Sequence, residues 1–116
     1  MEYDKVLEIY QSLVSDHSNL AVKGAANKYT AMNGNMFSFL NKDDATFCFR
    51  YSEAGKKAYN DANGTNDVIS YGAVMHGYVV MSPEIMADDA ALKDHFARCV
   101  EHAKTLKPKP TKKPKK

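Results

Sequence analysis

The sequence contains few cysteines, no long apolar run and no secretory signal. Its two cysteines, Cys48 and Cys99, each lie within an apolar pattern, and two thiols of this kind need no bond in a reducing compartment. No segment approaches the roughly 18 apolar residues that a membrane span requires. Charged residues also interrupt the first apolar positions of the chain. We therefore expect a cytoplasmic protein that makes no membrane contact.

The sequence also lacks the short motifs of the common catalytic sites. It has no G-x-S-x-G nucleophile elbow, no paired-carboxylate motif, no phosphate-binding Walker loop and no dinucleotide fingerprint. His76 is the only histidine outside a helical pattern or helix end, and a general base needs a partner to hold or activate. We therefore expect no catalytic residue, no cofactor and no enzyme activity.

Basic charge is concentrated in the last ten residues. Six of the sixteen lysines and arginines and three of the four prolines lie there; without these lysines, ten basic residues face fourteen acidic ones, a net charge of −4. We expect one folded domain over residues 1–106 and a disordered tail over residues 107–116, because alternating proline and lysine can neither continue a helix nor bury apolar surface. Any attraction for nucleic acid would come mainly from the tail lysines. These are Lys107, Lys109, Lys112, Lys113, Lys115 and Lys116.

Apolar residues spaced by three and four positions predict helices. The first helix ends at residues 15–19, and a second begins after the capping residue Ser52 and stops at Asn63-Gly64. Ser82-Pro83 predicts a further helix start, and Asp88 or Asp89 caps the last helix. The apolar stripes are Tyr3, Val6, Leu7, Tyr10, Leu13 and Val14 in the first helix, and Leu92, Phe96, Cys99, Val100 and Ala103 in the last.

Alternating patterns predict about five strands. Residues 28–32 and 36–40 flank Asn33-Gly34, two residues that tolerate the positive φ angles of a type I′ turn. A third strand is predicted over residues 46–51, and two more over residues 68–71 and 78–81. The order helix, three strands, helix, two strands, helix predicts an α+β fold, in which an antiparallel sheet has helices packed on one face.

The third predicted strand is rich in aromatic residues that either stack nucleic-acid bases or form the core. Alternation places Phe47, Phe49 and Tyr51 on one face of the strand. The glycine-containing motif of an RNA-binding strand is absent, and burial of one phenylalanine contributes roughly 1.5–3 kcal/mol. We therefore assign this row to the core.

The opposite face of the sheet is the expected interaction surface. Alternation places Thr46, Cys48 and Arg50 there, opposite the phenylalanine row. In the preceding strand, the same rule separates Phe37 and Phe39 from the other side chains, which are Met36, Ser38 and Leu40. We expect Ser38, Thr46 and Arg50 to be exposed and available to a partner.

Three metal-capable side chains follow one side of the last helix. His95, Cys99 and His102 are spaced by four and three positions. One helix rarely completes a metal site, and nothing in the sequence brings Cys48 or His76 close to these residues. We therefore assign the three to packing and to the end of the helix, and expect no metal.

Several segments of the chain resemble the amino-terminal domain of the TfoX/Sxy family, in its stand-alone form. The resemblance extends from the first helix to the lysine-rich end, and its most specific part is the hairpin with the strand MFSFL. It implies a small α+β domain in a family named after bacterial regulators of natural competence, without a catalytic residue set. Longer members carry a second, helical domain, and many members have a Met-Phe-Gly element near the place of residues 24–27. The segments are NKYTAMNGNMFSFL, TFCFRYSEAGKKAY, YGAVMHGYVVMSPEIM and LKPKPTK.

Together these features predict a non-enzymatic interaction or regulatory module. Its expected partner is an unidentified protein that contacts the open sheet face, or a second copy that forms a homodimer through an edge strand. One alternative is a weak nucleic-acid accessory protein that uses its lysine tail. Another is a small-molecule-binding protein or enzyme that uses the loop of residues 72–77, which runs from Gly72 to Gly77, with His76 and Tyr78 as binding residues.

Overall fold

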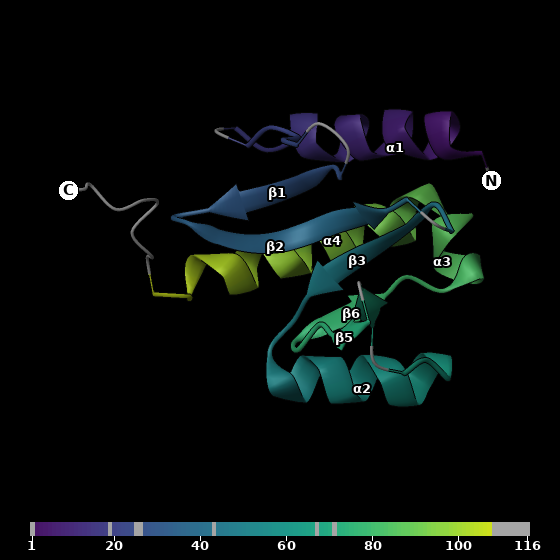
Figure 1. The fold of residues 1–116 in the computed structure, drawn as a ribbon, viewed down its shortest axis with the longest axis vertical. Coiled ribbons are helices and arrows are strands. Elements are labelled where there is room, and N and C mark those ends of the chain that lie inside the picture. The colour runs from purple at the N-terminus through teal and green to yellow at the C-terminus, as the bar shows by residue number, and fades with distance from the viewer. Residues whose placement is uncertain are drawn as a thin grey trace.

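The computed structural model describes residues 2–18, 20–24, 27–42, 44–66, 68–70 and 72–107. They form an α+β fold around an antiparallel sheet of four strands in the order β1-β2-β3-β6, with a separate two-stranded sheet, β4-β5 (Figure 1). The predicted fold class is therefore confirmed. The strands are β1 (Tyr29–Met32), β2 (Asn35–Asn41), β3 (Thr46–Arg50), β4 (Ile69–Ser70), β5 (Ala73–Val74) and β6 (Tyr78–Val80), and the helices are α1 (Tyr3–Ser15), α2 (Glu53–Asn63), α3 (Pro83–Met86) and α4 (Asp89–Lys104).

Local signals in the sequence set the turns and helix ends. Asn33 and Gly34 both have positive φ angles, of 53° and 83°, as the predicted turn between β1 and β2 requires. The Ser52 side chain accepts a hydrogen bond from the Gly55 backbone N–H at the start of α2, and Gly64 ends that helix in the left-handed conformation. These predicted boundaries are confirmed.

The main core lies between one face of the sheet and the helices. Side chains of α1, α3 and α4 pack there against the phenylalanine row, and Phe47 and Phe49 are fully buried. Figure 1 shows α4 running behind the sheet, and α2 lying beyond the edge strand β6. The prediction that this aromatic row belongs to the core is confirmed.

A β-bulge changes the faces that were predicted for β2. Thr30 pairs with Ser38, but the next residue, Ala31, pairs with Met36, so that Phe37 is the extra residue between them. Phe37, Ser38 and Leu40 consequently face the helices, whereas Met36 and Phe39 face the other side. Simple alternation, which separated Phe37 from Ser38 and Leu40, was wrong here.

The second face of the sheet is covered by a smaller cluster and is not open. Phe39, Cys48 and Tyr78 of the sheet pack with Val68, which precedes β4, and with Met75, which follows β5. The prediction of five strands in one sheet was wrong because β4 and β5 form their own hairpin. The hairpin segment lies over this face, which removes an apolar surface from water.

Candidate functional site

The three side chains predicted for an open sheet face do not form a common exposed surface. Ser38 is fully buried and takes part in hydrogen bonds with Tyr10 and Thr30. Thr46 is half-buried at the start of β3, where its hydroxyl donates to Asp44. Arg50 is half-buried and lies opposite Tyr78 in the β3–β6 pairing. The predicted binding surface is therefore wrong, because the pairing of β2 with β3 places Ser38 opposite Phe49 on the helix side, and the second cluster covers much of the other face.

The fold also separates the two residues, His76 and Tyr78, that were predicted to bind a small molecule together. His76 is exposed on the segment between β5 and β6, whereas Tyr78 is buried and its hydroxyl donates to the Met36 carbonyl over 2.7 Å. Tyr78 is therefore a structural residue of the second cluster. Burial raises its pKa above the ordinary value, so the phenol keeps its proton.

The beginning of the lysine tail is attached to the domain. Buried Asn35 donates from its side-chain nitrogen to the Lys107 carbonyl over 2.8 Å. The other five tail lysines lie outside the described residues, and they are Lys109, Lys112, Lys113, Lys115 and Lys116. Binding of nucleic acid by the tail therefore stays a prediction.

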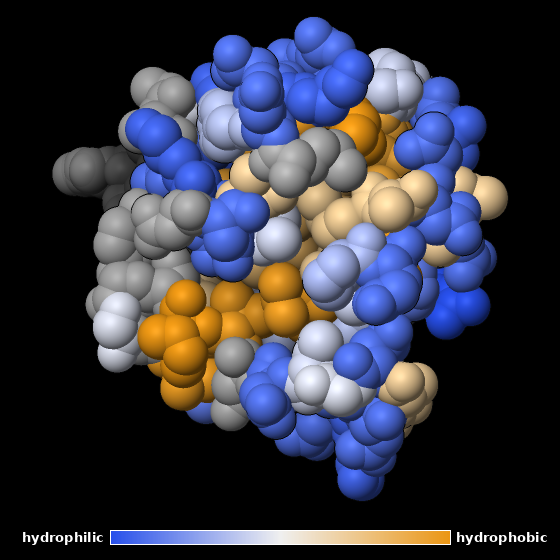
Figure 2. Space-filling view, turned by 90° about the vertical axis from the view of Figure 1, so that its right-hand side faces the viewer, coloured by the Kyte–Doolittle hydropathy of each residue, from blue (hydrophilic) through white to orange (hydrophobic). Residues whose placement is uncertain are grey.

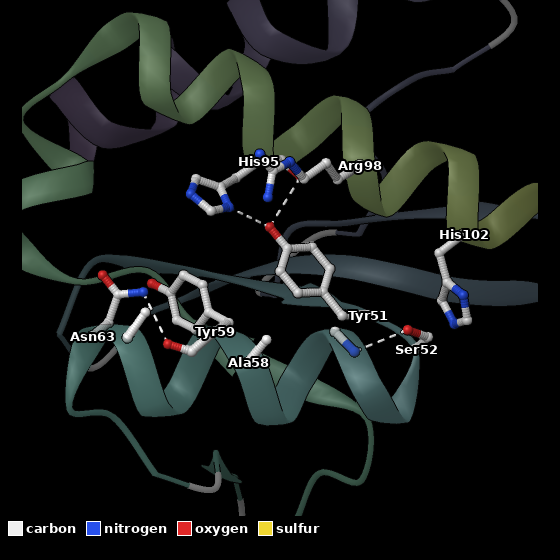
Figure 3. Close-up of a pocket in the computed structure, with 10 residues that line it drawn as sticks. Tyr51, Ser52, Ala58, Tyr59, Asn63, His95, Arg98 and His102 are labelled. Carbon is white, nitrogen blue, oxygen red and sulfur yellow. Dashed lines mark hydrogen bonds between the residues drawn. The ribbon is translucent and has the colours of Figure 1, made fainter.

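A groove between α2 and α4 brings together functional side chains from distant parts of the chain (Figure 3). Its volume is about 470 Å³, within the range of about 300–1,000 Å³ found for small-molecule sites. Small residues of α2 form one wall, and a row of basic residues on α4 forms the other. The lining residues are Tyr51, Ser52, Gly55, Ala58, Tyr59, Ala62, Asn63, His95, Arg98 and His102.

Tyr51 and His95 connect the two walls of the groove. The Tyr51 hydroxyl lies 2.5 Å from His95 Nδ1, and the rings stack at a centroid distance of 6.1 Å. Burial raises the pKa of Tyr51, whereas burial and the neighbouring Arg98 lower the pKa of His95. Near neutral pH the contact therefore joins a protonated phenol to an uncharged imidazole, and the tautomer of His95 decides which of the two atoms donates.

Tyr59 anchors the α2 wall to the edge of the sheet. Its hydroxyl donates to the Val80 carbonyl over 2.9 Å and accepts from the Ser82 backbone N–H over 3.0 Å. These bonds occupy the last carbonyl of the edge strand β6 and a backbone N–H just beyond that strand. The Tyr59 ring also meets His95 edge-on, with centroids 5.4 Å apart. The aromatic part of the groove is thus held in place by hydrogen bonds at both tyrosines.

Gly55 leaves space for the two residues that precede α2. A Cβ atom at this position would lie 3.1 Å from Ser52 Oγ and 3.5 Å from Tyr51 Cβ. A glycine within a helix costs about 1 kcal/mol relative to alanine. A side chain at this position would crowd the hydroxyl of Ser52, which caps the helix.

The ionisable groups on the α4 wall are all nitrogen bases. Arg98 is largely exposed, and its guanidinium forms an ion pair with Asp94 over 2.8 Å on the same helix. His102 lies near Ser52 at one end of the groove (Figure 3). Burial and the charge of Arg50 both lower the pKa of His102, so this imidazole is neutral near pH 7. No carboxylate is among the lining residues.

The two thiols and the metal-capable residues do not form a reactive centre. Cys48 and Cys99 are buried and unbonded to one another, and burial raises the pKa of Cys48 to about 12 and that of Cys99 well above its ordinary value. Cys99 donates to the Phe96 carbonyl. Within the described part of the chain, no three histidine, cysteine or acidic residues are grouped so that they could hold a metal ion.

The β4–β5 hairpin presents the other notable surface. Ile69 and Val74 pair across the two strands and are 55% and 38% exposed, respectively. Figure 2 shows strongly apolar atoms gathered in a patch among hydrophilic ones. In the described part of the chain, Ile69 and Val74 are the two large apolar side chains that are exposed, and exposed apolar residues mark an interaction site only where they form a large contiguous patch. The groove is therefore the stronger candidate.

The sequence contained partial signals for the groove. The helical spacing of His95 and His102 places them on one side of the last helix but favours packing over a site, and alternation in the third strand places Tyr51 in the core. Arg98 lies between the two histidines on the same helical side, and Ala58 and Ala62 follow the same spacing in α2. The spacing within each helix was visible, but the sequence did not show that the two helix faces meet.

Comparison with known proteins provides no relative: no family model, curated protein or solved structure matches the chain. In the described part of the chain, no helix has both the length and the apolar character needed to cross a membrane.

Proposed function

We propose that this protein is a non-enzymatic binding module that recognises a small ligand in the groove between α2 and α4. The proposal rests on one observation. Three basic side chains of α4, namely His95, Arg98 and His102, line a hollow whose opposite wall consists largely of small α2 residues. A concave site with a few convergent polar groups and an apolar lining is the usual form of a small-molecule site.

The chemistry of the groove favours binding over catalysis. Tyr51 keeps its proton because its pKa is raised, and its hydrogen bond occupies Nδ1 of neutral His95. Both thiols are buried with raised pKa values, so neither supplies a thiolate nucleophile at neutral pH. The groove can donate hydrogen bonds and hold a ring, but it presents no activated nucleophile.

The resemblance to TfoX/Sxy amino-terminal domains agrees with a regulatory role in the cytoplasm of a bacterium. In this role, a ligand bound between α2 and α4 would connect the β3–α2 junction with the last helix. A protein partner or a second copy of the chain would then respond to the occupied state. The resemblance supports the regulatory role, and the groove is the proposed site of ligand binding.

Proton–nitrogen correlation spectra with a panel of small metabolites test the proposal. Ligands should shift the amide signals of α2 and α4 residues, and Ala58→Trp should abolish these shifts because the indole fills the hollow. Ala90→Trp places the same side chain at an exposed position of α4 outside the groove lining and should leave binding unchanged. Shifts that survive Ala58→Trp would contradict the assignment of the site. Mass-spectrometric conversion of a bound panel member would contradict a non-enzymatic role.

A further inference from the structure

The charge and ring arrangement of the groove narrow the class of ligand. This inference rests on the proposed function and concerns the same site. We propose that the ligand is a small organic anion with a planar ring: its ring lies against Tyr51, Tyr59 and His95, and its negative group contacts Arg98 and His102.

The aromatic part of the site is preorganised for a planar group. Tyr51, Tyr59 and His95 have ring centroids 5.4–6.1 Å apart, and hydrogen bonds hold both phenols. Ala58 and Ala62 are exposed and occupy little of the space opposite α4. A ring can therefore enter the hollow without first ordering its walls, which lowers the entropy cost of binding.

The guanidinium of Arg98 is available to an anion. Its ion pair with Asp94 is an i,i+4 pair on the helix surface, with side chains 64% and 57% exposed. Such exposed pairs contribute little, because water and salt screen the charges. The five N–H donors of an arginine also exceed what one carboxylate can use. A ligand carboxylate or phosphate can therefore share Arg98 with Asp94, or replace the carboxylate.

His102 adds a donor that responds to the charge of the ligand. Burial and Arg50 of β3 lower its pKa and so disfavour its imidazolium form. On the α2 side, the lining residue near His102 is Ser52, which carries no charge. On α4 itself, Arg98 is the other cation that lines the groove. An anion beside His102 offsets these positive charges and favours proton uptake, so affinity should increase as pH falls.

A matched pair of probes tests this charge requirement. We would titrate the full chain with 2-naphthoate and its neutral isostere 2-naphthamide, and add phenyl phosphate to distinguish a phosphate from a carboxylate ligand. We expect 2-naphthoate or phenyl phosphate to shift α2 and α4 amide signals with an affinity at least about tenfold above that of the amide, as a charge-assisted hydrogen bond provides. Arg98→Gln should remove this difference. Lys93→Gln removes one positive charge from an exposed position of α4 outside the groove lining and should preserve it.

The outcomes separate this inference from the proposed function. Equal binding of 2-naphthamide in the groove would overturn the anionic ligand but leave a binding groove. Absence of groove shifts with these probes and with the metabolite panel would overturn both. A second hollow is lined by His17, Val100 and Lys104, among others. Anion binding that is lost in Lys104→Gln and kept in Arg98→Gln would place the site there and would also overturn the inference. A dissociation constant for 2-naphthoate that decreases from pH 7.5 to pH 5.5, and no longer does so in His102→Gln, would support the role of His102.

Discussion

The Tyr51 hydroxyl and Nδ1 of His95 share a hydrogen bond of 2.5 Å across 44 positions of the sequence. This contact joins the end of β3 to the middle of α4, on either side of the groove. It also couples the tautomer of His95 to the phenol, since Nδ1 either accepts a hydrogen bond from the phenol or donates one to it. The same two rings therefore contribute to the fold and to the proposed site.

Tyr51→Phe should remove this hydrogen bond and keep the ring. We expect a loss of roughly 0.5–1.5 kcal/mol in the free energy of unfolding, as for one hydrogen bond. We also expect the nitrogen signals of the His95 ring to show a changed balance of tautomers, because the hydrogen bond at Nδ1 is lost. Urea denaturation and long-range nitrogen–proton spectra would measure the two effects. Tyr3→Phe on α1, outside the groove lining, is the matched control, and an unchanged His95 tautomer in Tyr51→Phe would contradict the assignment.

Ser38→Ala tests the buried polar cluster behind β2. Ser38 lies in hydrogen-bond contact with both Tyr10 and Thr30, and all three side chains are fully buried. Its removal leaves buried hydroxyls short of a partner, so we expect a loss of about 1–3 kcal/mol in the free energy of unfolding. Thr46→Ala, which removes an exposed bond to Asp44, should change stability by less than about 0.5 kcal/mol. Equal small effects in urea denaturation would mean that Ser38 is not in the core.

The stability of the domain should decrease in mild acid because of His95 and His102. The pKa of each is lowered from its ordinary value of 6.5, so the unfolded chain binds protons more readily than the folded one. Above pH 6.5 both histidines are neutral in either state, and their full contribution to the free energy of unfolding is present. That contribution is lost as pH falls through 6.5 toward the folded-state pKa values. The urea midpoint should therefore fall between pH 7.5 and pH 5.

A double variant separates the histidine effect from the titration of carboxylates. His95→Gln with His102→Gln should flatten the pH dependence between pH 7.5 and pH 5, whereas His76→Gln, at an exposed position, should not. The same slope in the double variant and in the unaltered chain would show that other groups cause the decrease.

The lysine tail provides a prediction about nucleic acid. Six lysines follow Leu106, and the rest of the chain has a net charge of −4. We expect any binding of labelled duplex DNA or single-stranded RNA to require the tail, and to weaken strongly between about 50 and 200 mM salt because phosphate contacts release counterions. Fluorescence anisotropy with the full chain and with residues 1–106 measures this. Binding by residues 1–106 alone would place the contact on the folded body.

Local signals made much of the fold predictable from the sequence. The Asn33-Gly34 turn, the Ser52 cap and the left-handed Gly64 depend on residues within a few positions of one another, and each was predicted correctly. The apolar stripe of α4 was equally clear, because its period places the buried residues on one side of the helix.

Features that depend on distant pairing could not be predicted in this way. The bulge at Phe37 exists only relative to β1, and it reverses the faces of neighbouring residues in β2. The β4–β5 hairpin covers a face that was expected to be open. The groove has the same origin, because α2 and α4 each show an ordinary helical pattern, and the fold alone places Ala58 opposite His95.

The most direct measurement of the central proposal is a set of intermolecular nuclear Overhauser effects between a bound ring anion and methyl-labelled protein. We predict contacts from the ring of 2-naphthoate to the methyl groups of Ala58 and Ala62 on the α2 wall. Contacts confined to the exposed methyl groups of Ile69 and Val74 would contradict it, because they would show that the hairpin, and not the groove, holds the ligand.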